Sequence, residues 1–218
     1  RLVIIVYRSH RFHPGVFSRF ITVDALLFFI PVHDAADEWR DKGGTCLGCS
    51  NRLRQAEQAL EKIKDADGII LASPVHNGFV TGLMTVFFER AIWRLCRPTG
   101  ELLGLKGCPE PRLTDKVRAV ATIVSAGLVP PELRSYCDSG TPWMMETGSL
   151  MVNGSPVGDL YAAAVFPRQL SDQEWPRAYF LRELTEEQLT EAYQLGVRLV
   201  LAIKEGRVKA HDPLANLP

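Results

Sequence analysis

Three short polar groups in this sequence contain residue types that bind anionic ligands, and each group begins where an apolar run ends. The first contains Ser9, Arg11 and Ser18, the second is Ser73-Pro-Val-His-Asn-Gly78, and the third is Ser125-Ala-Gly127. Hydroxyl groups, a guanidinium and backbone amides all donate hydrogen bonds to anions. The pattern G-x-x-x-x-G-K-[ST] does not occur, so the first group predicts an anion site other than a P-loop.

Cysteine and histidine side chains form a second set of candidates. Cys46 and Cys49 lie close together in a glycine-rich stretch, and thiolates at this spacing bind metals or form a redox-active dithiol. Four histidines follow predicted strands: His10, His13, His33 and His76. Together with thiolates, neutral imidazoles bind zinc or iron. The alternative is that these histidines line a ligand cleft without binding a metal.

Apolar runs predict the strands that position these groups. Four of the runs are short and rich in Val, Ile, Leu, Ala and Phe: Leu2–Tyr7, Ala25–Val32, Gly68–Ser73 and Val117–Val124. A fifth strand is expected within Gly148–Val152, continued at Leu160–Phe166. Strands that alternate with helices indicate an α/β fold with a parallel sheet covered on both faces. Ligands of such sheets bind beyond the carboxyl ends of the strands, where the polar groups fall.

Helices are predicted between the strands. Apolar residues recur at helical spacing over three segments: Asn51–Lys64, Phe79–Trp93 and Leu184–Lys204. The second is apolar nearly all round, so we expect the sheet to cover one side and a partner chain another. Capping-box patterns occur at Ser171–Glu174 and Thr185–Gln188, and Gly206 predicts the end of the last helix.

No repeat, linker or shift in composition divides the chain. We therefore expect a single domain over residues 1–218, with loop insertions near 97–115 and 128–147. Proline and glycine are frequent at the start of the first insertion. Loops on a rigid scaffold carry specificity, so both insertions are expected to shape a substrate pocket.

One stretch of the sequence resembles the central motif of the flavodoxin-like NADPH-dependent FMN reductases. It reads Ala66-Asp-Gly-Ile-Ile-Leu-Ala-Ser-Pro-Val-His-Asn-Gly-Phe-Val-Thr-Gly82 and is closest to the iron–sulfur flavoprotein branch. The resemblance implies a flavodoxin-like, doubly wound sheet of five parallel strands in the order 2-1-3-4-5. It also implies a loop that wraps the flavin ring of FMN, with contacts from Ser73, Pro74, Val75, His76, Asn77 and Gly78.

The resemblance extends to the other two polar groups. Ser9 and Arg11 match the Ser-x-Arg of the family's phosphate loop, and Ser18 would supply a further hydroxyl. Ser125 and Gly127 match the position of the family's third flavin loop, which is rich in glycine. FMN would therefore be bound by all three polar groups.

The cysteine pair also has a counterpart in the resemblance. Cys46 and Cys49 match the first two positions of a C-x2-C-x2-C motif that holds a [4Fe–4S] cluster, but Arg52 occupies the third. A cubane cluster is held by four thiolates, so two more would have to come from distant cysteines. We therefore favour a redox dithiol or the remnant of a lost cluster over a complete cluster.

Composition limits the classes of partner. The chain has 218 residues, a formal net charge of zero and 46% hydrophobic residues, which is typical of a folded globular protein. A neutral chain has no net positive charge to attract nucleic acid or an anionic membrane. No apolar run approaches the ~20 residues that span a bilayer. We expect a reduced, cytoplasmic protein that binds neither nucleic acid nor membrane.

These observations and the resemblance predict an NAD(P)H-dependent FMN oxidoreductase. NAD(P)H would reduce bound FMN, which would pass electrons to a small-molecule acceptor, with His76 as the candidate catalytic proton donor. The resemblance also implies a homodimer or homotetramer. The alternative is a flavodoxin-like protein that has lost flavin and is a binding module or a His/Cys metal-dependent enzyme. Its basis is that Arg8, Val16 and Phe17 depart from the family's phosphate loop.

Overall fold

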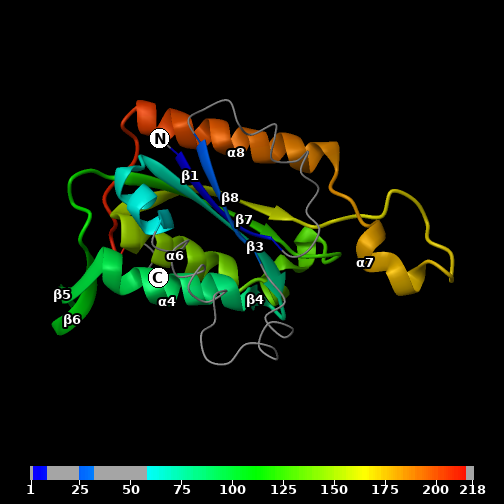
Figure 1. The fold of residues 1–218 in the computed structure, drawn as a ribbon, viewed down its shortest axis with the longest axis horizontal. Helices are drawn as coiled ribbons and strands as arrows, with labels where there is room; N and C mark the ends of the chain where they lie inside the picture. The colour runs from blue at the N-terminus through cyan, green and yellow to red at the C-terminus, as the bar shows by residue number, and fades with distance from the viewer. Residues whose placement is uncertain (1, 9–24, 32–57, 215–218) are drawn as a thin grey trace, which may run out of the picture.

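Five parallel strands run through the centre of the molecule (Figure 1). The computed structural model describes residues 2–8, 25–31 and 58–214. The strands are β1 (Leu2–Arg8), β2 (Ala25–Pro31), β3 (Gly68–His76), β7 (Arg118–Ser125) and β8 (Gly154–Ala162). They pair in the order β2-β1-β3-β7-β8, each parallel to its neighbours. In chain order this is 2-1-3-4-5, so the predicted α/β class and the order of the parallel strands agree with the structure.

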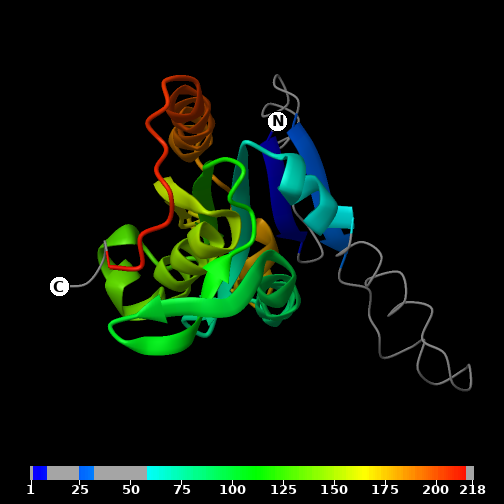
Figure 2. The ribbon, with the colours of Figure 1, turned by 90° about the vertical axis from the view of Figure 1, so that its left-hand side faces the viewer.

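Helices cover both faces of this sheet (Figures 1 and 2). On one face lies α8 (Glu186–Lys204), and on the other lie α4 (Gly82–Leu95) and α6 (Gly140–Val152). A helix described over 58–65 packs on the same side as α4 and α6. The arrangement is the doubly wound one that alternating strands and helices predict.

The side chains of β3 divide between two apolar cores. Ile69 and Leu71 join the core beneath α4 and α6, whereas Ile70 and Ala72 join the core beneath α8. Successive side chains of a strand point to opposite faces, so a strand buried on both faces must be apolar throughout. This requirement explains the uninterrupted apolar sequence of the strand.

The predicted fifth strand is wrong in position. Its first part, Gly148–Val152, forms the last turns of α6, and β8 follows directly after it. A short apolar run does not distinguish a strand from a buried helix. Here the helix lies very close to the sheet, because a Cβ atom on Gly148 would come within 2.7 Å of the Leu71 side chain. Asn153, with φ of 52°, ends the helix in the left-handed conformation.

The first predicted loop insertion contains regular structure. Residues 96–111 form a hairpin of β5 (Cys96–Leu102) and β6 (Leu105–Pro111). It lies at the end of the sheet opposite the carboxyl ends of the parallel strands (Figure 1). Its turn consists of Leu103 and Gly104, both with positive φ, and Leu103 is 78% exposed. The prediction failed because Leu-Gly, unlike Asn-Gly, carries no strong signal for a two-residue turn.

The second predicted insertion is also more ordered than the sequence indicated. It contains the short helices η1 (Pro131–Leu133) and α5 (Arg134–Cys137), followed by the first turns of α6. Proline, glycine and small polar residues lower helical propensity there, and contacts with other elements determine the structure instead. That the chain is a single domain remains a prediction.

The two capping-box patterns have different outcomes. At the start of α8, the Thr185 hydroxyl accepts a hydrogen bond from the Gln188 amide and the Gln188 side chain accepts one from Thr185 N–H. At Ser171, the hydroxyl instead donates to the Glu174 carboxylate, which also pairs with Arg168, and the segment forms a turn. The final helix ends as predicted, since Gly206 has φ of 65°.

Helix α4 begins later than predicted and has one uncovered face. Phe79–Val80 form the short strand β4, and the Thr81 hydroxyl accepts a hydrogen bond from the Met84 amide at the helix start. Val86 and Trp93 remain 41% and 54% exposed. The predicted partner chain would cover this face, and the homodimer or homotetramer stays a prediction.

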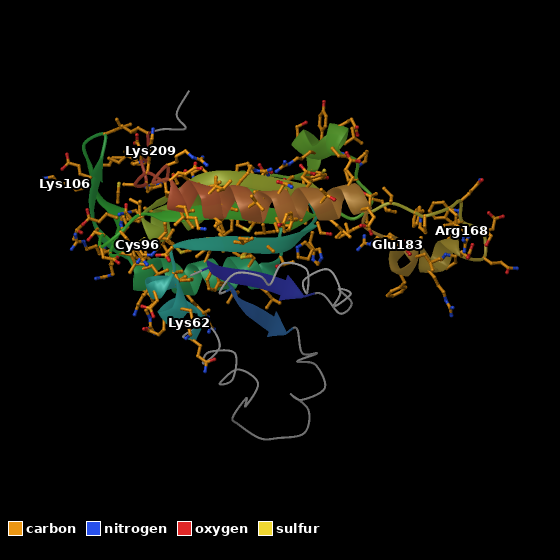
Figure 3. The ribbon with its side chains drawn as sticks, turned by 90° about the horizontal axis from the view of Figure 1, so that it is seen from above. Lys62, Cys96, Lys106, Arg168, Glu183 and Lys209 are labelled. Atoms are coloured by element: carbon orange, nitrogen blue, oxygen red, sulfur yellow. The ribbon has the colours of Figure 1, made fainter. Side chains whose placement is uncertain are left out.

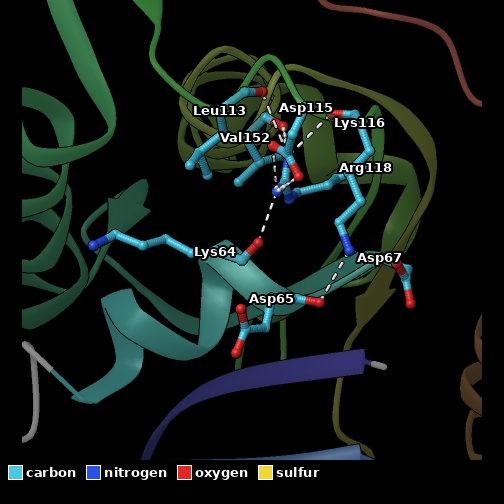
Figure 4. A network of polar contacts seen from close by, with 8 residues as sticks. All are labelled: Lys64, Asp65, Asp67, Leu113, Asp115, Lys116, Arg118 and Val152. Carbon is cyan, nitrogen blue, oxygen red and sulfur yellow. Dashed lines mark hydrogen bonds and ion pairs between the residues drawn. The ribbon is translucent and has the colours of Figure 1, made fainter.

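A buried arginine closes the amino end of the sheet (Figure 4). Arg118, at the start of β7, is fully buried and donates hydrogen bonds to the carbonyl groups of Lys64, Lys116 and, at longer range, Leu113 and Val152. It also pairs with the exposed carboxylate of Asp115 at 3.0 Å. Two of these carbonyls belong to the last turns of helices, where a cation is favoured by the helix dipole.

Candidate functional site

The strand β3 ends in a tight hairpin at the carboxyl edge of the sheet. β3 and β4 pair antiparallel, with Val75 opposite Val80 and His76 opposite Phe79. The two turn residues, Asn77 and Gly78, have φ of 51° and 80°. Consecutive positive φ values are those of a type I′ turn, for which Asn-Gly is the preferred pair. The sequence Asn77-Gly78 therefore shapes the loop that the resemblance assigned to the flavin ring.

The side chain of Ser73 has a structural role in this hairpin. It is 3% exposed, and its hydroxyl accepts a hydrogen bond from Thr81 N–H at 3.1 Å and donates one to the Pro74 carbonyl at 2.9 Å. Ser73 thus joins the two strands behind the turn. Of the predicted contacts, His76 and Asn77 are the exposed ones, while Val75 packs partly against the core.

A second segment holds the tip of the hairpin in place. The Gly78 carbonyl accepts hydrogen bonds from both the backbone N–H and the hydroxyl of Ser139, at 3.0 and 2.8 Å. Next to it, a Cβ atom on Gly140 would lie 2.7 Å from the Val80 nitrogen. Only glycine allows this approach, so the start of α6 supports the hairpin directly. Ser139 and Gly140 were not among the predicted site residues.

A charged cluster anchors the same segment to β8. The guanidinium of Arg134 pairs with Asp138 at 3.0 Å and with Asp159 at 2.5 Å, and it lies 5.0 Å from the centre of the Tyr161 ring. The buried Asp138 carboxylate also accepts hydrogen bonds from Thr141 N–H and its hydroxyl, at 2.9 and 2.6 Å. Asp138 therefore caps α6 while Arg134 ties that cap to the sheet.

Tyr161 and Cys137 lie within this cluster. The Tyr161 hydroxyl donates a hydrogen bond to the Val129 carbonyl at 3.2 Å and lies 3.5 Å from the Cys137 sulfur. Burial, together with the neighbouring Cys137 and Asp138, raises the pKa of Tyr161 above its ordinary value. The phenol is therefore neutral at physiological pH and acts as a hydrogen-bond donor.

The loop after β7 lies beside the hairpin. Pro74 is opposite Ser125 in the parallel pairing of β3 and β7. Beyond Ser125, Gly127 has φ of 65°, and a Cβ atom there would lie 2.9 Å from a guanidinium nitrogen of Arg182. The structure thus brings together two of the three predicted polar groups, Ser73–Gly78 and Ser125–Gly127. It adds Arg182, which no local pattern indicates.

The backbone of these two loops fits a ligand that accepts hydrogen bonds. Within the described part of the chain, the N–H groups of Asn77, Gly78 and Gly127 donate to no backbone carbonyl. All three residues have positive φ, and they belong to adjacent loops at one edge of the sheet. Amide donors without a described backbone acceptor suit the carbonyl oxygens and ring nitrogens of a flavin.

Several predicted residues lie outside the described ranges. These are the phosphate-loop candidates Ser9, Arg11 and Ser18, the cysteines Cys46 and Cys49, and the histidines His10, His13 and His33. Their roles stay predictions. The described histidine of that set, His76, is exposed at the end of β3.

Nothing in the described ranges supports a metal centre. No group of three or more His, Cys, Asp or Glu residues in residues 2–8, 25–31 and 58–214 is arranged to hold a metal ion. Cys137 lies beside the hairpin tip, whereas Cys96 and Cys108 belong to the β5–β6 hairpin at the other end of the sheet. Burial raises the pKa of the Cys96 thiol to about 11. The [4Fe–4S] cluster, which the sequence left as the less favoured possibility, therefore has no support in the described residues.

A family match includes the loops at the centre of this site. Residues 40–128 match the family of NADPH-dependent FMN reductases. The matched stretch contains both the Ser73–Gly78 hairpin and the Ser125–Gly127 loop. The match supports the predicted family and, with it, the enzyme class of NAD(P)H-dependent FMN oxidoreductases. It does not distinguish the iron–sulfur flavoprotein branch. No curated protein matches the chain.

Three solved structures have a fold similar to that of this chain. A flavone reductase has a TM-score of 0.54 and 15% identity, with 95% of this chain and 64% of that chain covered. The Trp repressor binding protein from Bacillus subtilis has a TM-score of 0.51 and 13% identity, with 89% and 98% covered. A flavodoxin, WrbA-like protein from Agrobacterium tumefaciens has a TM-score of 0.50 and 11% identity, with 97% and 99% covered. The flavodoxin-like fold is thereby confirmed.

These similar structures are comparable in fold and differ in size. The chain spans 64% of the length of the flavone reductase but nearly all of the other two proteins.

In the described residues, no helix is long and apolar enough to cross a bilayer.

Proposed function

We propose that this chain is an FMN-dependent oxidoreductase that uses NAD(P)H and delivers electrons to a small-molecule acceptor. The observation that carries the proposal is the Asn77–Gly78 turn beside the Gly127 loop, since the N–H groups of these three residues donate to no backbone carbonyl of the described residues. The family match over residues 40–128 supports it. Bound FMN would supply the hydride-accepting and hydride-donating chemistry.

The chain's own contribution would be to bind and orient the cofactor. The amides of Asn77, Gly78 and Gly127 would donate hydrogen bonds to it, and Ser139 would keep the hairpin in one position through the Gly78 carbonyl. The exposed imidazole of His76 would provide a proton when the acceptor requires one. Ser9, Arg11 and Ser18 remain the proposed phosphate contacts.

The test compares two described hairpins whose turn residues both have positive φ, Asn77–Gly78 and Leu103–Gly104. Asn77→Ala removes the favoured residue from the turn at the carboxyl edge, and Leu103→Ala is the matched control at the other end of the sheet. Asparagine tolerates the left-handed conformation better than alanine, so Asn77→Ala is expected to cost up to about 1 kcal/mol. Leu103 already has a Cβ atom at positive φ, so Leu103→Ala should change this cost little. We expect Asn77→Ala to raise the FMN dissociation constant about tenfold and to slow FMN-dependent NAD(P)H oxidation, while Leu103→Ala leaves both unchanged.

Two further variants separate the causes. Asn77→Gly keeps the turn but removes the amide side chain, so an intermediate loss of affinity assigns part of the binding to that side chain. Cys46→Ser should lose less flavin than Asn77→Ala. Equal FMN affinity in Asn77→Ala and the wild type would contradict this placement of the cofactor. A protein that never binds FMN would instead favour the alternative of a binding module.

A further inference from the structure

Arg182 lies directly over the loop that follows β7. A Cβ atom on Gly127 would come within 2.9 Å of Nη1 of Arg182, so any larger residue at this position would displace the guanidinium. Gly127 also has φ of 65°, which side chains other than glycine rarely adopt. Glycine is therefore favoured at position 127 both by the backbone conformation and by the close approach of the positively charged Arg182 guanidinium.

The backbone around Arg182 is fixed by neighbouring contacts. Glu183 and Val165 exchange two hydrogen bonds of 2.8 Å, which close the base of a projecting segment, residues 163–183. The Gln188 side chain donates to the Ala163 carbonyl at 2.5 Å, and Ala164 N–H donates to the Gly127 carbonyl at 2.6 Å. These hydrogen bonds therefore fix the position of the backbone at Arg182 relative to the Gly127 loop.

The base of the segment contacts the sheet, whereas its outer part does not lie near the candidate site. In Figure 1 the segment, including α7 (Ala178–Leu181), extends away from the sheet, and Figure 3 shows Arg168 beyond Glu183 at its outer end. Arg168 pairs there with Glu174, and Arg177 is exposed. Arg182 is the arginine of the segment that reaches the candidate site, since it is the one that touches the β7 loop.

We infer that Arg182 supplies the positive charge that stabilises the reduced form of FMN. The inference rests on the proposed function, because it requires FMN at the Ser73–Gly78 and Ser125–Gly127 loops. When NAD(P)H gives up a hydride, it leaves as NAD(P)⁺, and the two electrons and one proton add a negative charge to the flavin ring. A guanidinium beside the ring favours that charge, and charge near the ring sets its reduction potential.

The experiment measures how tightly oxidised and reduced FMN bind to the full chain. Wild type, Arg182→Met and Arg182→Lys are titrated with oxidised FMN in air and with dithionite-reduced FMN under anaerobic conditions. Arg177→Met is the matched control, because it removes the same charge from the exposed part of the same segment. Thermal melting of each variant checks that the fold is retained.

We expect Arg182→Met to lower the affinity for reduced FMN relative to oxidised FMN about tenfold. For a two-electron couple this equals a reduction potential lower by about 30 mV. Arg182→Lys should keep most of the ratio, and Arg177→Met should keep all of it.

Three outcomes would overturn the inference. One is an unchanged ratio in Arg182→Met, and the second is an equal change in Arg177→Met. The third is weaker NADPH binding in Arg182→Met with no change in the FMN ratio, which would assign the guanidinium to the phosphate groups of the pyridine nucleotide. Absence of FMN binding by the wild type would overturn the proposed function as well, whereas FMN binding with an unchanged ratio overturns the inference alone.

Discussion

Each end of the sheet is fixed by an arginine, but the two arginines are used differently. At the amino end, Arg118 is fully buried and donates mainly to backbone carbonyls. At the carboxyl end, the Arg134 side chain is 33% exposed and pairs with Asp138 and Asp159. The contacts of Arg118 join helix ends to the sheet. Those of Arg134 position the segment that supports the Asn77–Gly78 hairpin. The difference separates residues that maintain the fold from residues that maintain the site.

The largest expected effect is a loss of stability at the amino end. Arg118→Met would leave the Lys64 and Lys116 carbonyls without their donor in a partly buried region, and an unsatisfied group costs up to about 1–3 kcal/mol. We expect the free energy of unfolding in urea to fall by about 2–4 kcal/mol. The FMN affinity of the folded fraction should stay that of the wild type.

Arg118→Lys refines this prediction. An ammonium group lacks the planar fork that reaches several carbonyls at once, so lysine should recover only part of the lost stability. A full recovery would show that charge alone matters at this position. Loss of FMN affinity in folded Arg118→Met would remove the distinction between the two ends.

A smaller loss of stability and a larger effect on binding are expected at the carboxyl end. Arg134→Met removes the pairing of two carboxylates that remain partly hydrogen-bonded or exposed, so the expected loss is about 1–2 kcal/mol. Because the segment supporting the hairpin tip would loosen, FMN should bind about tenfold more weakly. Urea unfolding and FMN fluorescence titration measure the two effects on the same sample. A variant that loses stability but keeps FMN affinity would contradict the positioning role.

The smallest effects concern the two sequences that share a capping-box pattern. Thr185→Ala should destabilise the protein by about 1 kcal/mol, because the Thr185 hydroxyl caps α8. Ser171→Ala should cost under about 0.5 kcal/mol, since Ser171 lies in an exposed turn. Thermal melting compares the pair, and equal losses would show that the turn at Ser171 is as important as the cap.

The sequence predicted the parts of the molecule that depend on local periodicity. Continuous apolar runs predicted the positions of four of the five parallel strands, and the polar groups after β3 and β7 meet at one edge, as parallel pairing requires. The capping pattern located α8 because its two partners are three residues apart. These features need no knowledge of distant contacts.

The features that the sequence did not reveal depend on distant residues. Arg134 and Asp159 meet only after α5 packs on β8, and Arg182 reaches Gly127 only because the intervening segment returns to the sheet. Gly148 was read as part of a strand, although its lack of a side chain lets α6 approach Leu71. The hydrogen bond between the Ser73 hydroxyl and Thr81 also depends on the hairpin, while the flavin contact of Ser73 stays a prediction. A single sequence contains no signal for such pairings.

The most direct test of the central claim is a titration of the wild-type chain of residues 1–218 with FMN, followed by fluorescence quenching and absorbance near ~450 nm. We predict saturable binding of one FMN per chain with a dissociation constant in or below about the micromolar range. Unsaturable binding at FMN concentrations of about 100 μM would contradict the assignment of the Asn77–Gly78 hairpin and the Gly127 loop as a flavin site.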